Sequence, residues 1–377
     1  MGSGEKTTCL YAYHVAQAAR MAAFAGYMMP LNYANGALKE HLACREGAAV
    51  FDVSHMAQLD IVHPSGSAAP ILAALETLIP ANLIDLPEHQ QRYGLLLNEH
   101  GGIIDDLMVI HAGDYVRLVV NAGCAEKDLN WLLARLPDLG ITRRQRALIA
   151  VQGPMAAEAV GRLVQLPKNM RFMQVAVSQF SGHQIELSRS GYTGEDGFEV
   201  SLPEEVAEDF AVALCKIEGV QMAGLVARDS LRLEAGLCLY GQDMDEEVSA
   251  VAASLNWAIP KIRRRGGARA GGFVGADKTL DELENGARFC RIGVLAEKGI
   301  PPRSGAPVFD AETGGNQVGV VTSGAPAPSV GRPVAMLRIA REVAESSTAL
   351  FAEVRGKRLV LTRTQMPFFP HRFYRGS

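Results

Sequence analysis

Gly101 and Gly102 lead directly into an apolar segment, residues 103–109, that carries two adjacent aspartates, Asp105 and Asp106. Glycine pairs favour tight turns, and the apolar content of the segment is typical of a buried strand. Side chains alternate between the two faces of a strand, so the two carboxylates should point in opposite directions. The sequence therefore predicts that at least one carboxylate leaves water, and such a group needs a partner or a chemical role.

A simpler interpretation of the same segment is that Gly101 and Gly102 close a hairpin. Both aspartates would then be turn or cap residues. For an Asp-Asp pair taken alone, this interpretation is the default, and only the rest of the chain can favour a functional role.

Length and composition exclude several classes of protein. A chain of 377 residues is too long for one ordinary core, so we expect two or three domains. Hydrophobic residues make up 48% and charged residues 21%, and no apolar stretch approaches the roughly 18 to 20 residues of a membrane span. The net charge of -4 gives no general attraction to nucleic acid. We expect a soluble globular protein that binds neither membrane nor nucleic acid.

The six cysteines have no C-x-x-C spacing. This pattern predicts neither a zinc site nor a disulfide framework, and it fits a reducing compartment. No metal site is expected, and no signal or targeting segment is visible at the N-terminus.

The first 262 residues mix helix and strand patterns. Residues 115–120 alternate as a strand, and residues 126–133 have helical apolar spacing. Residues 184–200 read as two strands joined by a loop with three glycines and two acids, and residues 225–236 read as a helix. This region is predicted to be α+β.

The composition changes at residues 263–275, where arginine and glycine dominate. Beyond this point, short alternating segments separated by Gly and Pro predict a small β-barrel or sandwich. We therefore predict a first region at 1–262, a linker at 263–284 and a β domain at 285–377. The basic run of residues 263–265 is expected to be a solvated loop or a docking patch.

Common catalytic motifs are missing from the sequence. It contains no G-x-S-x-G elbow, no phosphate-binding G-x-x-x-x-G-K-[ST] loop, no H-E-x-x-H zinc motif and no G-x-G-x-x-G dinucleotide fingerprint. Among the histidines, His55 is the most suggestive because Asp52 precedes it by three residues. A hydrogen-bonded structural histidine is the simpler interpretation.

Several ordered segments together resemble the aminomethyltransferase, or T-protein, family of the glycine cleavage system. The resemblance covers nearly the whole chain and rests on F-D-V-S-H-M at 51–56, G-G-I-I-D-D-L at 101–107, V-V-N-A-G-C at 119–124, S-G-Y-T-G-E-D-G-F-E at 190–199 and A-R-D-S-L-R-L-E-A-G-L-C-L-Y-G at 227–241. Five motifs in order are far more specific than any one of them.

The resemblance implies a fold and an activity. Members of this family build two interleaved α+β subdomains and a C-terminal β-barrel, arranged like a clover leaf around a folate channel. They take the aminomethyl group from the lipoyl arm of H-protein, transfer its carbon to tetrahydrofolate, and release ammonia and 5,10-methylenetetrahydrofolate. The resemblance places such a protein in the bacterial cytoplasm or the mitochondrial matrix.

The resemblance also implies roles for residues. Asp106 matches the family's catalytic carboxylate near the folate nitrogens N5 and N10, and Asp105 on the opposite face would be structural. Glu199 matches the residue that binds the N–H and amine edge of the pterin, although an outward strand position would explain it equally simply.

Arg228 matches the family's substrate-contacting arginine, and Arg232, one helical turn later, would support it through an ion pair. Val226 stands where the family commonly has a small residue, and its bulk is expected to affect the orientation of Arg228. Ordinary core packing competes with a binding role for the remaining pocket residues, which would be Met56, Tyr93, Val119, Asn121, Tyr192 and Trp257.

Other activities stay open at this point. Folate-dependent demethylases of methylated sulfonium compounds or amines share the fold, and the motifs chiefly indicate folate. A non-catalytic folate-binding factor of iron-sulfur assembly is another alternative, but such relatives typically carry K-G-C-Y-x-G-Q-E, which has no counterpart here. The chain is too short for a fused flavin oxidase and lacks its dinucleotide fingerprint.

Overall fold

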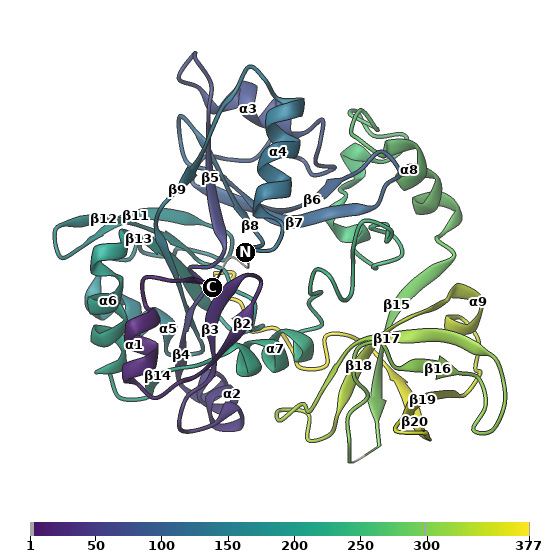
Figure 1. Cartoon of the computed structure of the whole chain (residues 1–377). Helices are drawn as coiled ribbons and strands as arrows, with labels where there is room; N and C mark the ends of the chain where they lie inside the picture. The colour runs from purple at the N-terminus through teal and green to yellow at the C-terminus, as the bar shows by residue number, and fades with distance from the viewer. Residues whose placement is uncertain (1–3, 298, 377) are drawn as a thin grey trace.

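The computed structural model describes residues 4–297 and 299–376. Three lobes meet at one centre, as in a clover leaf (Figure 1). Two of them are α+β and the third is all-β, which confirms the predicted fold class. None of the helices in the part of the chain described here is both long and apolar enough to cross a membrane.

The first lobe is built on a five-stranded antiparallel sheet in the order β6-β7-β8-β5-β9. Helices α3 (Ala68–Leu75) and α4 (Ala125–Arg135) pack on it. The glycine turn precedes β7, which therefore begins where the sequence predicts. The strands are β5 (Ala57–Val62), β6 (Gln90–Leu97), β7 (Ile103–His111), β8 (Val116–Val120) and β9 (Gly140–Arg144).

The second lobe contains a six-stranded sheet in the order β11-β12-β13-β10-β4-β14. Strand β4 precedes the first lobe in the sequence and the other strands follow it, so the two subdomains are interleaved as predicted. The strands are β4 (Ala48–Asp52), β10 (Ala147–Gln152), β11 (Val175–Phe180), β12 (His183–Ser188), β13 (Gly197–Leu202) and β14 (Val220–Met222).

Helices and a small sheet complete the second lobe. The small sheet has the order β1-β3-β2. Its strands and the surrounding helices are β1 (Lys6–Thr7), β2 (Arg20–Phe24), β3 (Tyr27–Asn32), α1 (Tyr11–Ala16), α2 (Ala37–Glu46), α5 (Ala156–Leu163), α6 (Ala207–Cys215) and α7 (Leu225–Glu234).

The third lobe is a closed barrel in the order β15-β18-β17-β16-β19-β20. Closure leaves no free sheet edge, which suits short strands with Gly and Pro turns. Its elements are β15 (Phe289–Ala296), β16 (Pro307–Phe309), β17 (Gln317–Ala325), β18 (Val334–Ala340), α9 (Arg341–Ala344), β19 (Leu350–Val354) and β20 (Lys357–Thr364).

The segment before the barrel is more structured than a flexible linker, because it contains helix α8 (Ala276–Asn285).

The prediction of a solvated basic loop is wrong for Arg263, which is buried. Its guanidinium donates to the Oε1 and the backbone oxygen of Glu76, both at 2.9 Å. Glu76 is itself buried and requires a cationic partner. The exact domain boundary stays a prediction.

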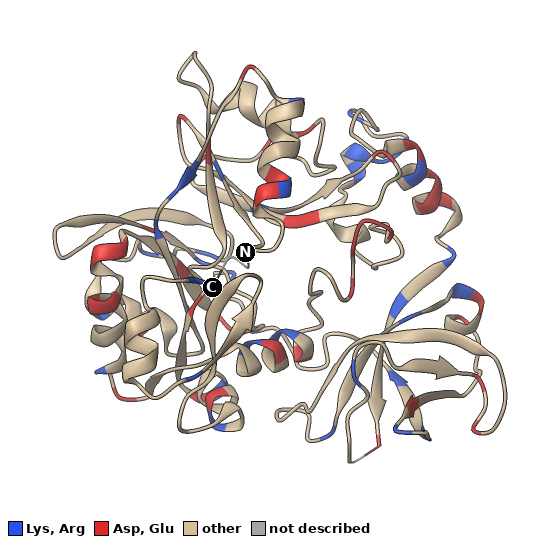
Figure 2. Ribbon diagram, in the orientation of Figure 1, with Lys and Arg blue, Asp and Glu red and all other residues tan. Residues whose placement is uncertain are grey.

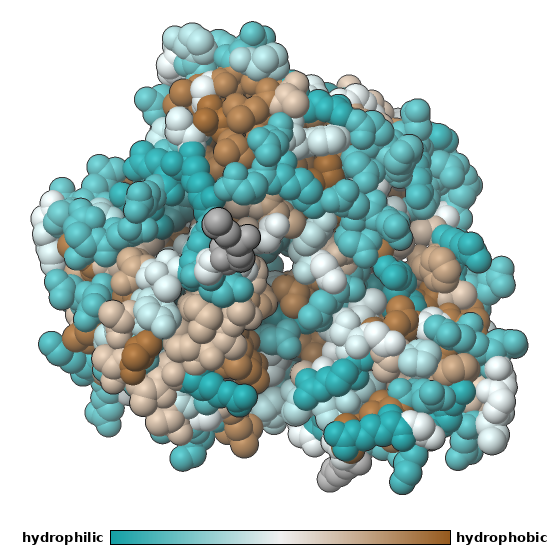
Figure 3. Space-filling model, viewed as in Figure 1, coloured by the Kyte–Doolittle hydropathy of each residue, from teal (hydrophilic) through white to brown (hydrophobic). Residues whose placement is uncertain are grey.

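All three lobes carry charged residues, and they surround a central hollow (Figure 2; Figure 3). Acidic and basic residues are spread over all three (Figure 2). The space-filling view shows the molecule hollowed at its centre, where the lobes meet (Figure 3).

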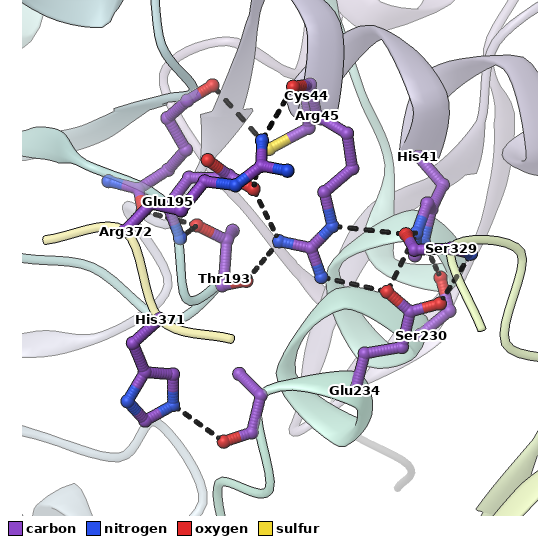
Figure 4. Close-up of polar contacts among 12 residues, drawn as sticks. His41, Cys44, Arg45, Thr193, Glu195, Ser230, Glu234, Ser329, His371 and Arg372 are labelled. Atoms are coloured by element: carbon purple, nitrogen blue, oxygen red, sulfur yellow. Dashed lines mark hydrogen bonds and ion pairs between the residues drawn. The ribbon is translucent and has the colours of Figure 1, made fainter. Parts of the chain in front are cut away.

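A buried ionic network joins α2, α7 and the barrel (Figure 4). Arg45 donates to Glu195 and to Glu234, each at 2.8 Å. Glu234 also lies 3.2 Å from Nε2 of His41 and accepts a hydrogen bond of 2.8 Å from the backbone N–H of Ser329 in the barrel. The network therefore fixes the barrel against the second lobe.

The C-terminal tail returns from the barrel to the second lobe. The backbone N–H of Arg372 donates to the oxygen of Gly194 at 2.7 Å, and that of Tyr374 donates to Asp196 at 3.3 Å. Both contacts are made to the glycine-rich loop between β12 and β13. The tail thus holds this loop in place from outside.

Candidate functional site

Asp105 and Asp106 lie in the middle of the first sheet, on β7 between β6 and β8. Tyr93 on β6 donates its hydroxyl to Asp106 at 3.0 Å. The side-chain amide of Asn121, just after β8, donates at 2.8 Å to both Asp106 and Asp105. The backbone N–H of Asn121 adds a bond of 3.0 Å to Asp105. Asn121 therefore bridges two carboxylates that the alternation of the strand directs apart.

Burial raises the pKa of Asp106 to about 7, and the charge of Asp105 adds to this effect. The hydrogen bonds from Tyr93 and Asn121 work in the opposite direction, because they stabilise the ionised form. Asp106 thus exchanges its proton near neutral pH, which is the range where a group can both accept and donate a proton effectively.

Asp128 is a third carboxyl group behind this pair, and the sequence analysis missed it. It lies in the first turn of α4 and is completely buried. Burial and the charge of Asp105 raise its pKa to about 10, so Asp128 is neutral at pH 7. A signal was present in the sequence: Asp128 shares the buried face of the helix with Ala125 and Leu132, where an acid is unexpected.

Replacing Tyr93 with phenylalanine should move the acidic limb of the pH profile of kcat/KM to higher pH by about one unit. The change removes a hydrogen bond that favours ionised Asp106, so the pKa of this carboxyl rises above about 7. Tyr11→Phe on α1 is the matched control and should leave the profile in place. An unmoved profile in Tyr93→Phe would show that Asp106 does not control this limb.

Glu199 lies on the facing sheet, on β13. Its Oε2 accepts a hydrogen bond of 2.9 Å from the hydroxyl of Ser190, which leaves Oε1 available to a ligand. Ile110 is four residues after Asp106 and therefore on the same face of β7. A polar cavity between the two sheets is lined from both sides by Gln58, Gln91, Ile110, Arg117, Val119, Leu148, Glu186, Ser188, Glu199 and Ser201. The face of β7 that carries Asp106 and Ile110 therefore points toward β13, the strand of Glu199.

Arg228 on α7 lies beside Glu199 and Tyr192. Its guanidinium carbon is 4.9 Å from the centre of the Tyr192 ring. Burial lowers the pKa of Arg228, and Glu199 counteracts the shift. Its Nη1 is buried and has no hydrogen-bond partner among the residues that the structure describes. Val226 is 45% exposed and points to solvent, so its bulk does not constrain this arginine.

Arg232 differs from Arg228 because its guanidinium is paired with carboxylates of the protein. It is buried and forms ion pairs of 2.8 Å with Asp229 and Asp243. It also donates to the hydroxyl of Ser323 on β17 at 2.9 Å. Arg232 is thus ion-paired as expected, and its hydrogen bond to Ser323 connects α7 to the barrel. Its support of Arg228 stays a prediction.

Trp257 packs against Tyr93, the residue that donates a hydrogen bond to Asp106. It lies in a short 3-10 helix, Asn256–Ala258, is 60% exposed, and stacks on Tyr93 with ring centres 5.0 Å apart. Met56 and Val119 belong to one apolar cluster between the sheets. The predicted residues therefore form two groups: Asp106, Tyr93, Asn121 and Trp257 on one side, and Glu199, Arg228 and Tyr192 on the other, with Met56 and Val119 between the sheets.

The expectation of a hydrogen-bonded His55 is wrong. The ring is buried, its Nδ1 has no partner in the described part of the chain, and burial lowers its pKa to about 4. Asp52 bonds instead to His14 Nε2 at 2.9 Å and to Thr8 at 2.6 Å. Both partners lie far from Asp52 in the sequence, so local spacing could not identify them.

Among residues 4–297 and 299–376, no group of three or more His, Cys, Asp or Glu side chains is arranged to hold a metal ion. The residues described above can exchange a proton, stabilise charge and form hydrogen bonds with a ligand.

Two family models match the chain. The model described as GCVT N-terminal domain matches residues 10–262, and that described as Glycine cleavage T-protein C-terminal barrel domain matches residues 290–370. Together they span both α+β lobes and the barrel.

Similar proteins cover nearly the full length. The mitochondrial aminomethyltransferase of Pisum sativum is 38% identical, with 99% of this chain and 91% of the relative covered. The probable mitochondrial aminomethyltransferase of Schizosaccharomyces pombe is 40% identical, with 99% and 95% covered. A crystal structure of the glycine cleavage system aminomethyltransferase T from Bartonella henselae is 40% identical, with a TM-score of 0.90 and 98% and 99% of the two chains covered.

Proposed function

The chain belongs to the aminomethyltransferase, or T-protein, family of the glycine cleavage system, and from this membership we propose that it is a tetrahydrofolate-dependent enzyme that acts on lipoylated H-protein. In this reaction the carbon leaves the sulfur and the nitrogen of the aminomethyl-lipoyl arm and bonds to N5 and N10 of tetrahydrofolate. The two hydrogens displaced from N5 and N10 end on ammonia and on the lipoyl thiol. The products are ammonia, 5,10-methylenetetrahydrofolate and dihydrolipoyl H-protein.

The observation that carries this proposal is Asp106, a carboxyl group with a pKa of about 7 that Tyr93 and Asn121 hold in a fixed position. Its ionised form would stabilise the positive charge that develops as the carbon passes to the folate nitrogens. It would also accept a proton from a folate nitrogen and return it to the departing amine. Asp105 and neutral Asp128 would position this group from behind.

Glu199 and Arg228 are proposed to hold the folate. The carboxylate of Glu199, with Oε1 available and Oε2 shared with the hydroxyl of Ser190, matches the neighbouring N–H and amine donors of a pterin edge. The unpartnered, buried Nη1 of Arg228 fits an oxygen acceptor on the ligand, because a buried donor without a partner is costly. Tyr192, Tyr93 and Trp257 would supply aromatic faces, and Met56 and Val119 apolar contacts.

Replacing Glu199 with glutamine should weaken the binding of tetrahydrofolate about 10- to 100-fold. The substitution keeps the shape but removes the charge and one of the two acceptors offered to the pterin. Isothermal titration calorimetry measures the effect, and Glu218→Gln, an exposed position, is the control. Equal affinities of wild type and Glu199→Gln would remove Glu199 from the proposed site.

The decisive test of the proposed function is product formation from aminomethylated H-protein and tetrahydrofolate by the purified protein. Ammonia and methylenetetrahydrofolate should appear together. Folate binding without a reaction of H-protein would favour the demethylase alternative, and methylated sulfonium compounds and methylamines would then be the donors to assay. The relatives in pea and fission yeast are named as mitochondrial, and for this chain we propose the compartment that holds its H-protein, either the mitochondrial matrix or the bacterial cytoplasm.

A further inference from the structure

The side-chain amide of Gln91 has no role in the site described above. Gln91 lies on β6 and is 3% exposed, and its Nε2 is a buried donor without a hydrogen-bond partner among the residues that the structure describes. Its backbone is fixed, because it pairs with Ile110 on β7 and its N–H donates to the oxygen of Met173 at 2.9 Å. A buried donor without a partner costs free energy, so this amide requires a partner that the fold does not supply.

Gln91 lines the same cavity as Glu199. The cavity lies between the two sheets, with Gln91 and Ile110 on one wall and Glu199 on the other. It has room for about one atom of the size of a water oxygen. A single polar atom of a ligand can therefore enter it, whereas a whole ring cannot.

The charges of this cavity are largely neutralised by the protein itself. Arg117, its cation, donates to Asp60 at 2.6 Å and also pairs with Glu186. Glu199 keeps Oε1 available, as described above. The cavity therefore presents one unused acceptor, on Glu199, and one unused donor, on Gln91.

We propose that Nε2 of Gln91 donates a hydrogen bond to the C4 carbonyl oxygen of the pterin, an inference that rests on the proposed function. In a pterin, the N3–H lies between the 2-amine and this oxygen. A carboxylate that accepts from the N3–H and the amine, as proposed for Glu199, leaves the neighbouring oxygen without a donor. Gln91 supplies a donor in the same cavity, and one protruding oxygen matches the size of the cavity.

The chemistry of the pterin places this oxygen on the wall of Gln91. The C4 oxygen and N5 lie on the same edge of the pterin, and Asp106 is proposed to act at N5. Asp106 and Ile110 share one face of β7, and Gln91 is the cross-strand partner of Ile110, so Gln91 extends the wall that carries Asp106. Arg228, another buried donor without a partner in the described residues, is not part of the lining of this cavity.

The test compares the wild type with Gln91→Met, which keeps the length of the side chain and removes the donor. Infrared difference spectra of the full-length protein with tetrahydrofolate, unlabelled and labelled with heavy oxygen at C4, give the stretching frequency of the bound carbonyl. This frequency should be higher in Gln91→Met, because a hydrogen bond to the oxygen weakens the C=O bond. The dissociation constant, measured by calorimetry, should rise about tenfold. Gln184→Met, the same change at an exposed position of β12, should leave both values unchanged.

A wild-type carbonyl frequency in Gln91→Met would overturn the inference. Weaker binding at that frequency would show that Gln91 only shapes the cavity, and unchanged binding would show that the cavity holds water. A frequency that moves only in Arg228→Met would assign the oxygen to Arg228 and overturn the inference as well. Failure of the wild type to bind tetrahydrofolate would instead overturn the proposed function, so the two failures are distinguishable.

Thermal unfolding verifies that Gln91→Met is folded. Its melting temperature should be no lower than that of the wild type, because the change removes a buried donor without a partner. Gln91→Leu also lacks the donor and takes the place of Gln91→Met if the methionine variant does not fold.

Discussion

The Asp106→Asn variant should lose about 10²- to 10⁴-fold in kcat while tetrahydrofolate stays bound. Asparagine preserves the size of the side chain and can still contact Tyr93 and Asn121. It can neither exchange a proton nor carry the negative charge that would stabilise the transferred carbon. Single-turnover formation of methylenetetrahydrofolate measures the loss, and calorimetry measures folate binding.

Asp114→Asn is a suitable control for Asp106→Asn, because Asp114 is an exposed turn residue after the same strand. It should retain the wild-type kcat. If Asp106→Asn also kept kcat within a factor of about three, the carboxylate would have no role in the chemical step. Weakened folate binding with an unchanged kcat would indicate a binding role instead.

The Glu234→Ala variant should lower the free energy of unfolding by about 3 to 5 kcal/mol. Glu234 is completely buried and is the common partner of Arg45, His41 and the backbone of Ser329 (Figure 4). Its removal leaves the guanidinium of Arg45 buried without this partner. Urea unfolding followed by circular dichroism measures the loss, and Glu342→Ala, exposed on α9, should stay near wild type.

This stabilisation should depend on pH with a definite sign. Burial alone would raise the pKa of Glu234, but its bonds to His41, Arg45 and Ser329 outweigh burial and hold the pKa below the usual value. A carboxyl group with a lowered pKa stabilises the fold above its unfolded pKa, and the contribution is lost as the pH falls. The difference between wild type and Glu234→Ala should therefore shrink in acid. A difference that grew in acid would contradict the ionic role of Glu234.

Local patterns in the sequence predicted several elements of the fold correctly, although they did not predict helix α8 within the expected linker. The predicted strand at 115–120 corresponds to β8, and the predicted helices at 126–133 and 225–236 correspond to α4 and α7. The alternating segments after residue 285 form the barrel. These predictions succeed because periodicity and turn residues act within a few positions of one another.

Local patterns could not identify ion-pair and hydrogen-bond partners that are distant in the sequence. Arg263 was expected in solvent, yet it is buried against Glu76, which is 187 residues away. His55 was expected to be hydrogen-bonded, but Asp52 instead uses His14 from the N-terminal helix. A local pattern indicates that a residue is charged, but it does not indicate which distant charge will meet it.

The sequence by itself determined the strand with its two aspartates, the glycine-rich loop and the β-barrel, because strand alternation and turn chemistry are local. Only the tertiary structure decided the chemical state of the site. The pKa of Asp106 depends on burial, on Asp105, and on hydrogen bonds from Tyr93 and Asn121, which come from neighbouring strands. Asp128 joins this cluster from a helix packed on the same sheet. Burial and charge proximity are properties of the assembled lobes, so no single segment encodes them.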